Sequence, residues 1–89
     1  MRAIVTVIGK DRVGIISAVC AVLSRENVNV LDISQTILNE NFTMVMLVDL
    51  AKAPLPFSEL AALLEKTGEA EKLSIRMQRE DIFKAMHRI

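Results

Sequence analysis

In residues 2–16, with the sequence RAIVTVIGKDRVGII, the spacing of the apolar side chains changes from that of a strand to that of a helix. Residues 2–8 are mostly β-branched and end at Gly9, which predicts a strand. Beyond a charged turn, apolar side chains recur at helical spacing over 12–26, namely Ile15, Ile16, Val19, Val22 and Leu23. This spacing predicts an amphipathic helix, with Asp11 as its N-cap.

The next segment, residues 28–38, predicts a long strand whose apolar side chains change sides partway along. Its early valines have one parity, whereas the later Ile33 and Ile37 have the other. A β-bulge adds one residue to a strand and so reverses the side on which the following residues lie. The pattern therefore predicts a bulge near Leu31 and Asp32.

Further elements follow toward the C-terminus. Residues 39–41, Asn-Glu-Asn, are a turn signal, and residues 42–50 are the next predicted strand, which gives a hairpin. Apolar side chains on one helical face predict a helix over 57–67. Apolar and polar residues alternate over 73–79, which is typical of a strand with one face exposed to solvent. Acidic residues at the start and basic residues at the end of 80–88 are typical of a C-terminal helix.

The predicted order is strand, helix, strand, strand, helix, strand, followed by the C-terminal helix. This is the α+β ferredoxin-like βαββαβ sandwich, a four-stranded antiparallel sheet with two helices on one face. We expect a single domain over residues 1–89, with its core over 2–79. The strand 42–50 has apolar residues at both even and odd positions, including the odd-numbered Val45 and Leu47, so both of its faces carry apolar side chains. The face without helices should therefore meet the C-terminal helix, a second chain or both.

The composition excludes several classes of function. With 11 basic and 11 acidic residues, three Phe and no Trp or Tyr, we expect no nucleic-acid binding. No apolar run approaches the roughly 18 residues of a membrane helix, and the N-terminus has no signal-peptide layout. A lone Cys20 and a lone His87 exclude an internal disulfide and a multi-histidine metal site. We expect a cytoplasmic protein without metal or cofactor.

The apolar content also predicts a partner. Of the 89 residues, 52% are apolar, while a folded chain of this length buries only about 64% of its surface. The surplus predicts contact with a second copy, as a homodimer or a larger homo-oligomer.

The turn over residues 9–15 is the candidate ligand site. Free amides at a helix N-terminus attract a carboxylate or phosphate, Gly14 allows close approach, and Lys10 and Arg12 add positive charge. The alternative, which the spacing alone favours, is an ordinary capped turn. Asn29, a polar residue in an apolar strand, faces either a ligand or solvent. No group of residues supplies a nucleophile with a base and its orienting partner, so we expect no enzyme.

Two segments, DRVGII over 11–16 and ENVNVLDI over 26–33, resemble the ACT domain family. That family joins a strand, a D-R-P-G-[IVL] turn and helix, and a (G/N)-V-N-I strand in the same βαββαβ order. The resemblance covers residues 2–79. The segments DISQT over 32–36 and FTMVM over 42–46 are similar to a group of small stand-alone ACT proteins of regulatory type, akin to the ACT regulator of glycine cleavage.

The resemblance implies a ligand site. ACT domains bind small ligands, often amino acids, between paired domains, with contacts from the first turn and the start of the second strand. Carried over residue by residue, the implied ligand-binding residues are Asp11, Arg12, Val13, Gly14, Ile15, Ile16 and Asn29. The sequence departs from the family pattern twice: Val13 replaces a common Pro, and Gly9 replaces a polar side chain found in some amino-acid-binding members.

Three functions remain open at this point. The first is a regulatory domain that binds a small molecule, an amino acid by resemblance, and acts as a homo-oligomer. The second is a ligand-free dimerisation or protein-interaction module, which the two-sided apolar sheet and Gly9 favour. The third is an acylphosphatase-like enzyme, for which Arg12 in a phosphate-holding loop is the only support.

Overall fold

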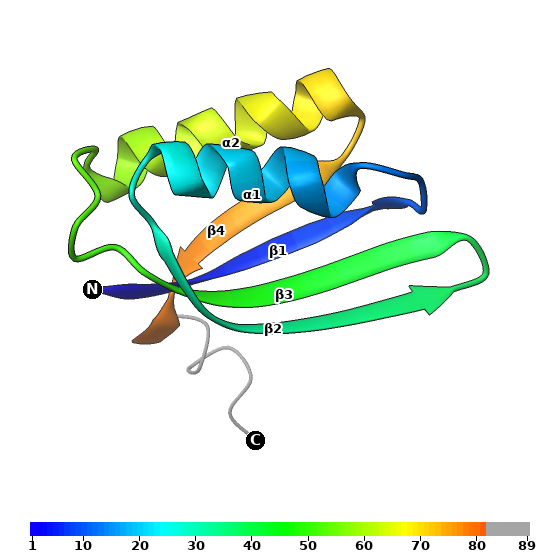
Figure 1. Ribbon diagram of the computed structural model, residues 1–89, viewed down its shortest axis with the longest axis horizontal. Coiled ribbons are helices and arrows are strands. Elements are labelled where there is room, and N and C mark those ends of the chain that lie inside the picture. Colours follow the sequence, from blue (N-terminus) through cyan, green and yellow to red (C-terminus); the bar gives the residue numbers. More distant parts are fainter. Residues whose placement is uncertain (82–89) are drawn as a thin grey trace.

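The computed structural model describes residues 1–81, which form a four-stranded sheet and two long helices. The elements are β1 (Arg2–Lys10), α1 (Ile15–Arg25), β2 (Asn29–Leu38), β3 (Asn41–Asp49), α2 (Phe57–Glu71) and β4 (Ser74–Arg79). The strands are antiparallel in the order β2-β3-β1-β4, and both helices lie on the same side of the sheet (Figure 1). The ferredoxin-like βαββαβ fold is thus confirmed. The predicted helix over 80–88 lies outside the described residues, apart from Glu80 and Asp81.

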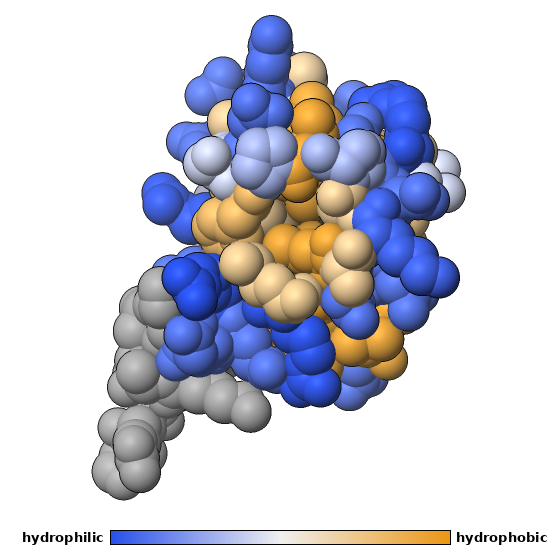
Figure 2. Space-filling view, turned by 90° about the vertical axis from the view of Figure 1, so that its left-hand side faces the viewer, coloured by the Kyte–Doolittle hydropathy of each residue, from blue (hydrophilic) through white to orange (hydrophobic). Residues whose placement is uncertain are grey.

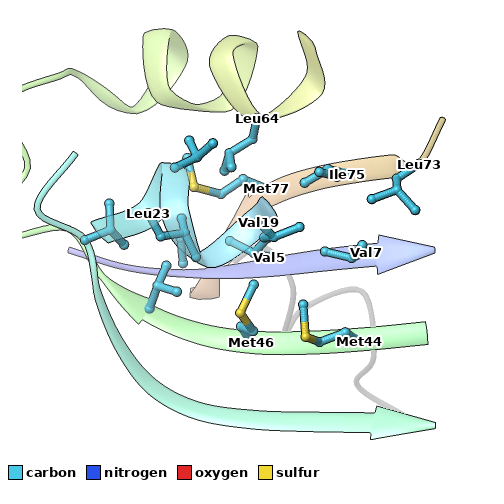
Figure 3. Packing of buried hydrophobic residues seen from close by; sticks show 14 of the residues in the cluster. Val5, Val7, Val19, Leu23, Met44, Met46, Leu64, Leu73, Ile75 and Met77 are labelled. Atoms are coloured by element: carbon cyan, nitrogen blue, oxygen red, sulfur yellow. The ribbon is translucent and has the colours of Figure 1, made fainter. Parts of the chain in front are cut away.

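The hydrophobic core fills the space between the sheet and the helices (Figure 3). Alternate residues of the strands point into it, because successive side chains of a strand face opposite sides. The following core side chains have no exposed surface: Val5, Val7, Val19, Met44, Met46, Leu60 and Leu64. At one end of the molecule, apolar atoms are surrounded by hydrophilic side chains (Figure 2). Leu50, Ala53 and Leu55, between β3 and α2, pack against the core.

The bulge in β2 is confirmed. The pairing of β2 with β3 shifts register between Val30 and Asp32, so that Leu31 is the extra residue. After the shift, Ile33 lies opposite the buried Met46. Directly opposed residues of an antiparallel pair point to the same face. The bulge therefore places Ile33 and Ile37 on the same, helix-covered side of the sheet as Val30.

The hairpin that joins β2 to β3 is also confirmed. Its two turn residues, Asn39 and Glu40, have φ values of 50° and 71°. Two consecutive positive φ values define the type I′ turn that matches the twist of paired strands. The backbone N–H of Asp11 donates to the carbonyl of Glu40 at 2.8 Å, which holds the hairpin tip beside the β1–α1 turn.

The start of α1 differs from the prediction. The helix begins at Ile15, and its N-cap is Gly14, with φ 93° and no side-chain capping bond. The predicted Asp11 cap is wrong, because β1 stays paired with β3 as far as Lys10, which lies opposite Asn41. Only two residues then separate Asp11 from Gly14, and the left-handed backbone of Gly14 turns the chain into the helix.

Candidate functional site

The β1–α1 turn, the first turn of α1 and the outer half of β2 enclose a groove of about 440 Å³. The groove contains five of the seven residues implied by the resemblance, namely Asp11, Arg12, Gly14, Ile15 and Ile16. Val13 does not line it, and with 97% of its surface exposed it points into solvent. The structure therefore gathers most of the turn residues at one surface.

The sequence reasoning missed four residues of this groove, which are Ser17, Gln35, Ile37 and Phe42. Gln35 and Ile37 reach the groove because they follow the bulge in β2 and lie opposite Met44 and Phe42. The predicted bulge could have placed them on this face, but nothing local to the turn indicates that β2 passes beside it.

The first turn of α1 presents free backbone donors to this groove. The first amide of this segment that is bonded to the turn is that of Ala18, which donates to the carbonyl of Gly14 at 2.9 Å. Within residues 1–81, the amides of Ile15, Ile16 and Ser17 have no acceptor. Such amides, aligned with the positive end of the helix dipole, bind carboxylate or phosphate groups.

Arg12 does not share this anion-binding role, because its guanidinium is bonded to other groups of the chain. Its Nη2 donates to the Glu71 carbonyl at 2.9 Å and to the Glu71 carboxylate at 2.8 Å, and its Nη1 donates to the Val13 carbonyl at 3.2 Å. The guanidinium therefore has a carboxylate partner at the end of α2. The residue that would hold an acyl phosphate is already neutralised.

Asn29 lies away from the turn. It begins β2, beside the last residues of α1, whereas the turn precedes the first residues of α1. A helix of 11 residues is about 16 Å long. Asn29 lines a separate hollow of about 580 Å³ with Cys20, Ser24 and Lys52, among others. A single copy of the chain therefore does not bring Asn29 to the turn.

Residues 1–81 contain no group of three or more His, Cys, Asp or Glu side chains that could hold a metal ion. No helix in this range is long and apolar enough to cross a membrane.

Comparison with known proteins agrees with the fold. The chain belongs to the ACT domain family, whose model matches residues 2–78. It is 53% identical to a UPF0237 protein of Bifidobacterium longum, over 99% of this chain and 98% of that one. A solved ACT domain protein from Streptococcus pneumoniae superposes with a TM-score of 0.83 at 37% identity, over 94% of each chain.

A more distant structure shares the fold. It is described as a candidate glycine cleavage system transcriptional repressor, and it superposes with a TM-score of 0.73 at 23% identity. The match covers 86% of this chain and 44% of that one. This likeness shows the shared fold, the predicted membership of the ACT domain family is confirmed, and no catalytic function is indicated by these relatives.

Proposed function

We propose that the chain is a regulatory ACT domain of the cytoplasm that forms a homodimer and binds an amino acid between its two copies. The observation that carries this proposal is the separation of the turn from Asn29. Two surfaces with groups suited to a small polar ligand lie at opposite ends of α1, so a second copy is needed to bring them together.

The edge of the sheet at β2 supports pairing with a second copy. β2 is an outer strand of ten residues, and among the strands of residues 1–81 only β3 pairs with it. Natural proteins blunt such an edge with charges, proline or a covering element. Here the edge instead carries exposed apolar side chains, namely Leu31 at 44%, Ile33 at 44%, Ile37 at 58% and Leu38 at 69% exposed. Ile16 of α1, 41% exposed, adds to this surface.

Pairing of two β2 strands about a twofold axis would unite the two parts of the site. If the strands pair antiparallel along their whole length, Asn29 of one copy lies opposite Leu38 of the partner subunit. Ile37, the neighbour of Leu38, lines the groove at the turn. The start of β2 in one copy, where Asn29 lies, would then be beside the groove at the end of β2 in the other copy, and the dimer would hold two equivalent sites.

The chemistry of this composite site suits an amino acid. The free amides of Ile15, Ile16 and Ser17 favour a carboxylate. Asn29 has no side-chain hydrogen bond within residues 1–81, so its amide oxygen is available to an ammonium group. Ile37 and Phe42 supply an apolar wall for a side chain.

A thermal-shift screen of the purified chain against the twenty amino acids tests this function. A ligand present at about 100 times its Kd should stabilise the protein by about 2.7 kcal/mol. The stabilisation should disappear in Asn29→Ala and persist in Ser58→Ala, a control on the exposed surface of α2. A well-folded dimer that no amino acid stabilises contradicts the proposal.

A ligand-free interaction module is the second candidate, favoured by the surroundings of Gly9. A side chain at this position would lie with its Cβ 2.5 Å from Leu73 Cδ2, so the place of a polar ligand contact is filled by packing. Under this function, affinity capture should return one specific protein, and Asn29→Ala should leave the capture unchanged. Loss of capture in Asn29→Ala would favour the ligand sensor.

A further inference from the structure

The face of the sheet opposite the helices carries an apolar strip, which we call the open-face strip: Ile4, Ile8, Val45 and Leu47. The pairing of Ile4 with Leu47 and of Thr6 with Val45 places these residues on one face. Within residues 1–81, both long helices lie on the other face (Figure 1). Exposure along the strip is uneven, because Ile4 is 8% exposed and Ile8 is 49% exposed.

The chain leaves the sheet at the Ile4 end of this strip. β4 ends at Arg79, which lies opposite Ala3, and Gln78 lies opposite Ile4. Arg2 shares the face of Ile4, because residues two apart in a strand point to the same side. Arg2 Nε donates to Glu80 Oε1 at 3.1 Å, and its Nη2 donates to the other carboxylate oxygen.

This two-point ion pair holds the start of the C-terminal segment against the open face. It also raises the pKa of the Arg2 guanidinium, chiefly through the hydrogen bond from Arg2 to Glu80. A bidentate pair fixes direction as well as distance, because the planar guanidinium matches the carboxylate edge. Glu80 is therefore held on the face of the sheet that carries Ile4 and not on the face that the helices cover.

The remaining sequence suits this position in length and pattern. Residues 82–89 read IFKAMHRI, and the apolar members Ile82, Phe83, Met86 and Ile89 recur at helical spacing. Eight residues in a helix extend about 12 Å. Four strand residues, the distance from Ile4 to Ile8, extend about 13 Å. A helical segment of this length is therefore long enough to cover the strip.

We propose that residues 82–89 of the same chain dock on the open-face strip, with their apolar side chains against Ile4, Val45, Leu47 and Ile8. This intramolecular cover removes the open face as a surface for assembly. A second copy is then left with the β2 edge. The inference does not depend on a ligand and stands or falls separately from the proposed function.

A crosslinking experiment on the full chain tests the occupant of the strip. In a Cys20→Ser background, Val45→Cys and Met86→Cys are combined and treated with a short bismaleimide, and the products are analysed by mass spectrometry. We expect a crosslink within one chain, and much less of it when Lys84→Cys replaces Met86→Cys. A crosslink between two chains, or equal yields at positions 84 and 86, overturns the proposal.

A second measurement covers the case in which the cysteine variants fold poorly. Phe83→Ser in the full chain should raise the fluorescence of a dye that binds exposed apolar surface several-fold, whereas Lys84→Ser should leave it unchanged. Equal fluorescence in the two variants and the parent chain overturns the proposal. Neither measurement requires an amino acid, so their failure would leave the proposed function untouched.

Discussion

Arg12 and Glu71 join the β1–α1 turn to the end of α2: Arg12 Nη2 lies 2.9 Å from the Glu71 carbonyl oxygen and 2.8 Å from its carboxylate. The last turn of α2 contains no basic residue of its own. Arg12 therefore supplies the positive charge that the negative end of a helix dipole favours. The pair ties the turn to the end of α2 and engages the guanidinium in that junction.

Replacing Arg12 should loosen this junction. Arg12→Ala removes a half-exposed ion pair and a hydrogen bond to a helix carbonyl, and we expect a loss of about 1 kcal/mol in the free energy of unfolding. Urea titration measures it. Glu69→Ala, a change at an exposed residue of the same helix, is the control. Equal stability of the two variants would contradict the assigned role of Arg12.

Gly9 is required by packing and not by backbone conformation. Gly9→Ala would place a Cβ 2.5 Å from Leu73 Cδ2, so one of the two must move. We expect a destabilisation of about 1–3 kcal/mol, measured by urea titration. Because the clashing atom is the end of a side chain, Leu73→Ala should add less destabilisation in Gly9→Ala than in the parent chain. Full additivity of the two changes would argue against this contact.

Gly14 is required for the opposite reason. A Cβ at Gly14 would have open space, with Arg12 Nη1 at 3.9 Å as its nearest neighbour, but the φ of 93° is unfavourable for any L side chain. Gly14→Ala should therefore cost about 1–2 kcal/mol through strain. The thermal unfolding midpoint should fall, and Gly14→Asn should fall less, because Asn tolerates positive φ. Equal midpoints for Gly14→Ala and the parent chain would contradict the assigned backbone.

The β2 edge should control assembly. Ile37→Glu places a charge on the exposed apolar edge in both copies, and we expect dimerisation to weaken by about hundredfold or more, since each copy loses a buried side chain. Light scattering on fractionated protein measures the change. Ser58→Glu, on the exposed surface of α2, should leave the mass unchanged. An unaffected dimer in Ile37→Glu would move the interface elsewhere.

Periodicity in the sequence was sufficient for most of the fold. The parity change between the early valines of β2 and Ile33 predicted the bulge, because alternation in a strand leaves no other explanation for it. The start of α1 was predicted too early. A left-handed glycine can end a turn and cap a helix without any side-chain signal, so Gly14 was not distinguishable from a residue of the first helical turn.

The candidate site was only partly predictable. The turn residues are contiguous and could be found together, whereas Gln35 and Ile37 join them through strand pairing distant in sequence. The Arg12 interaction with Glu71 spans 59 positions and leaves no local pattern. The resemblance assigns Asn29 and the turn to a ligand site between paired domains, and a single chain holds the two apart.

Linkage between ligand binding and assembly tests the central claim most directly. The measurement is the dimer dissociation constant by analytical ultracentrifugation, with and without the amino acid that stabilises the chain most. A ligand bound between two copies must strengthen the dimer, and at saturation we expect the constant to fall by about tenfold or more. A ligand that stabilises the chain but leaves the dimer dissociation constant unchanged would contradict a site shared between two copies.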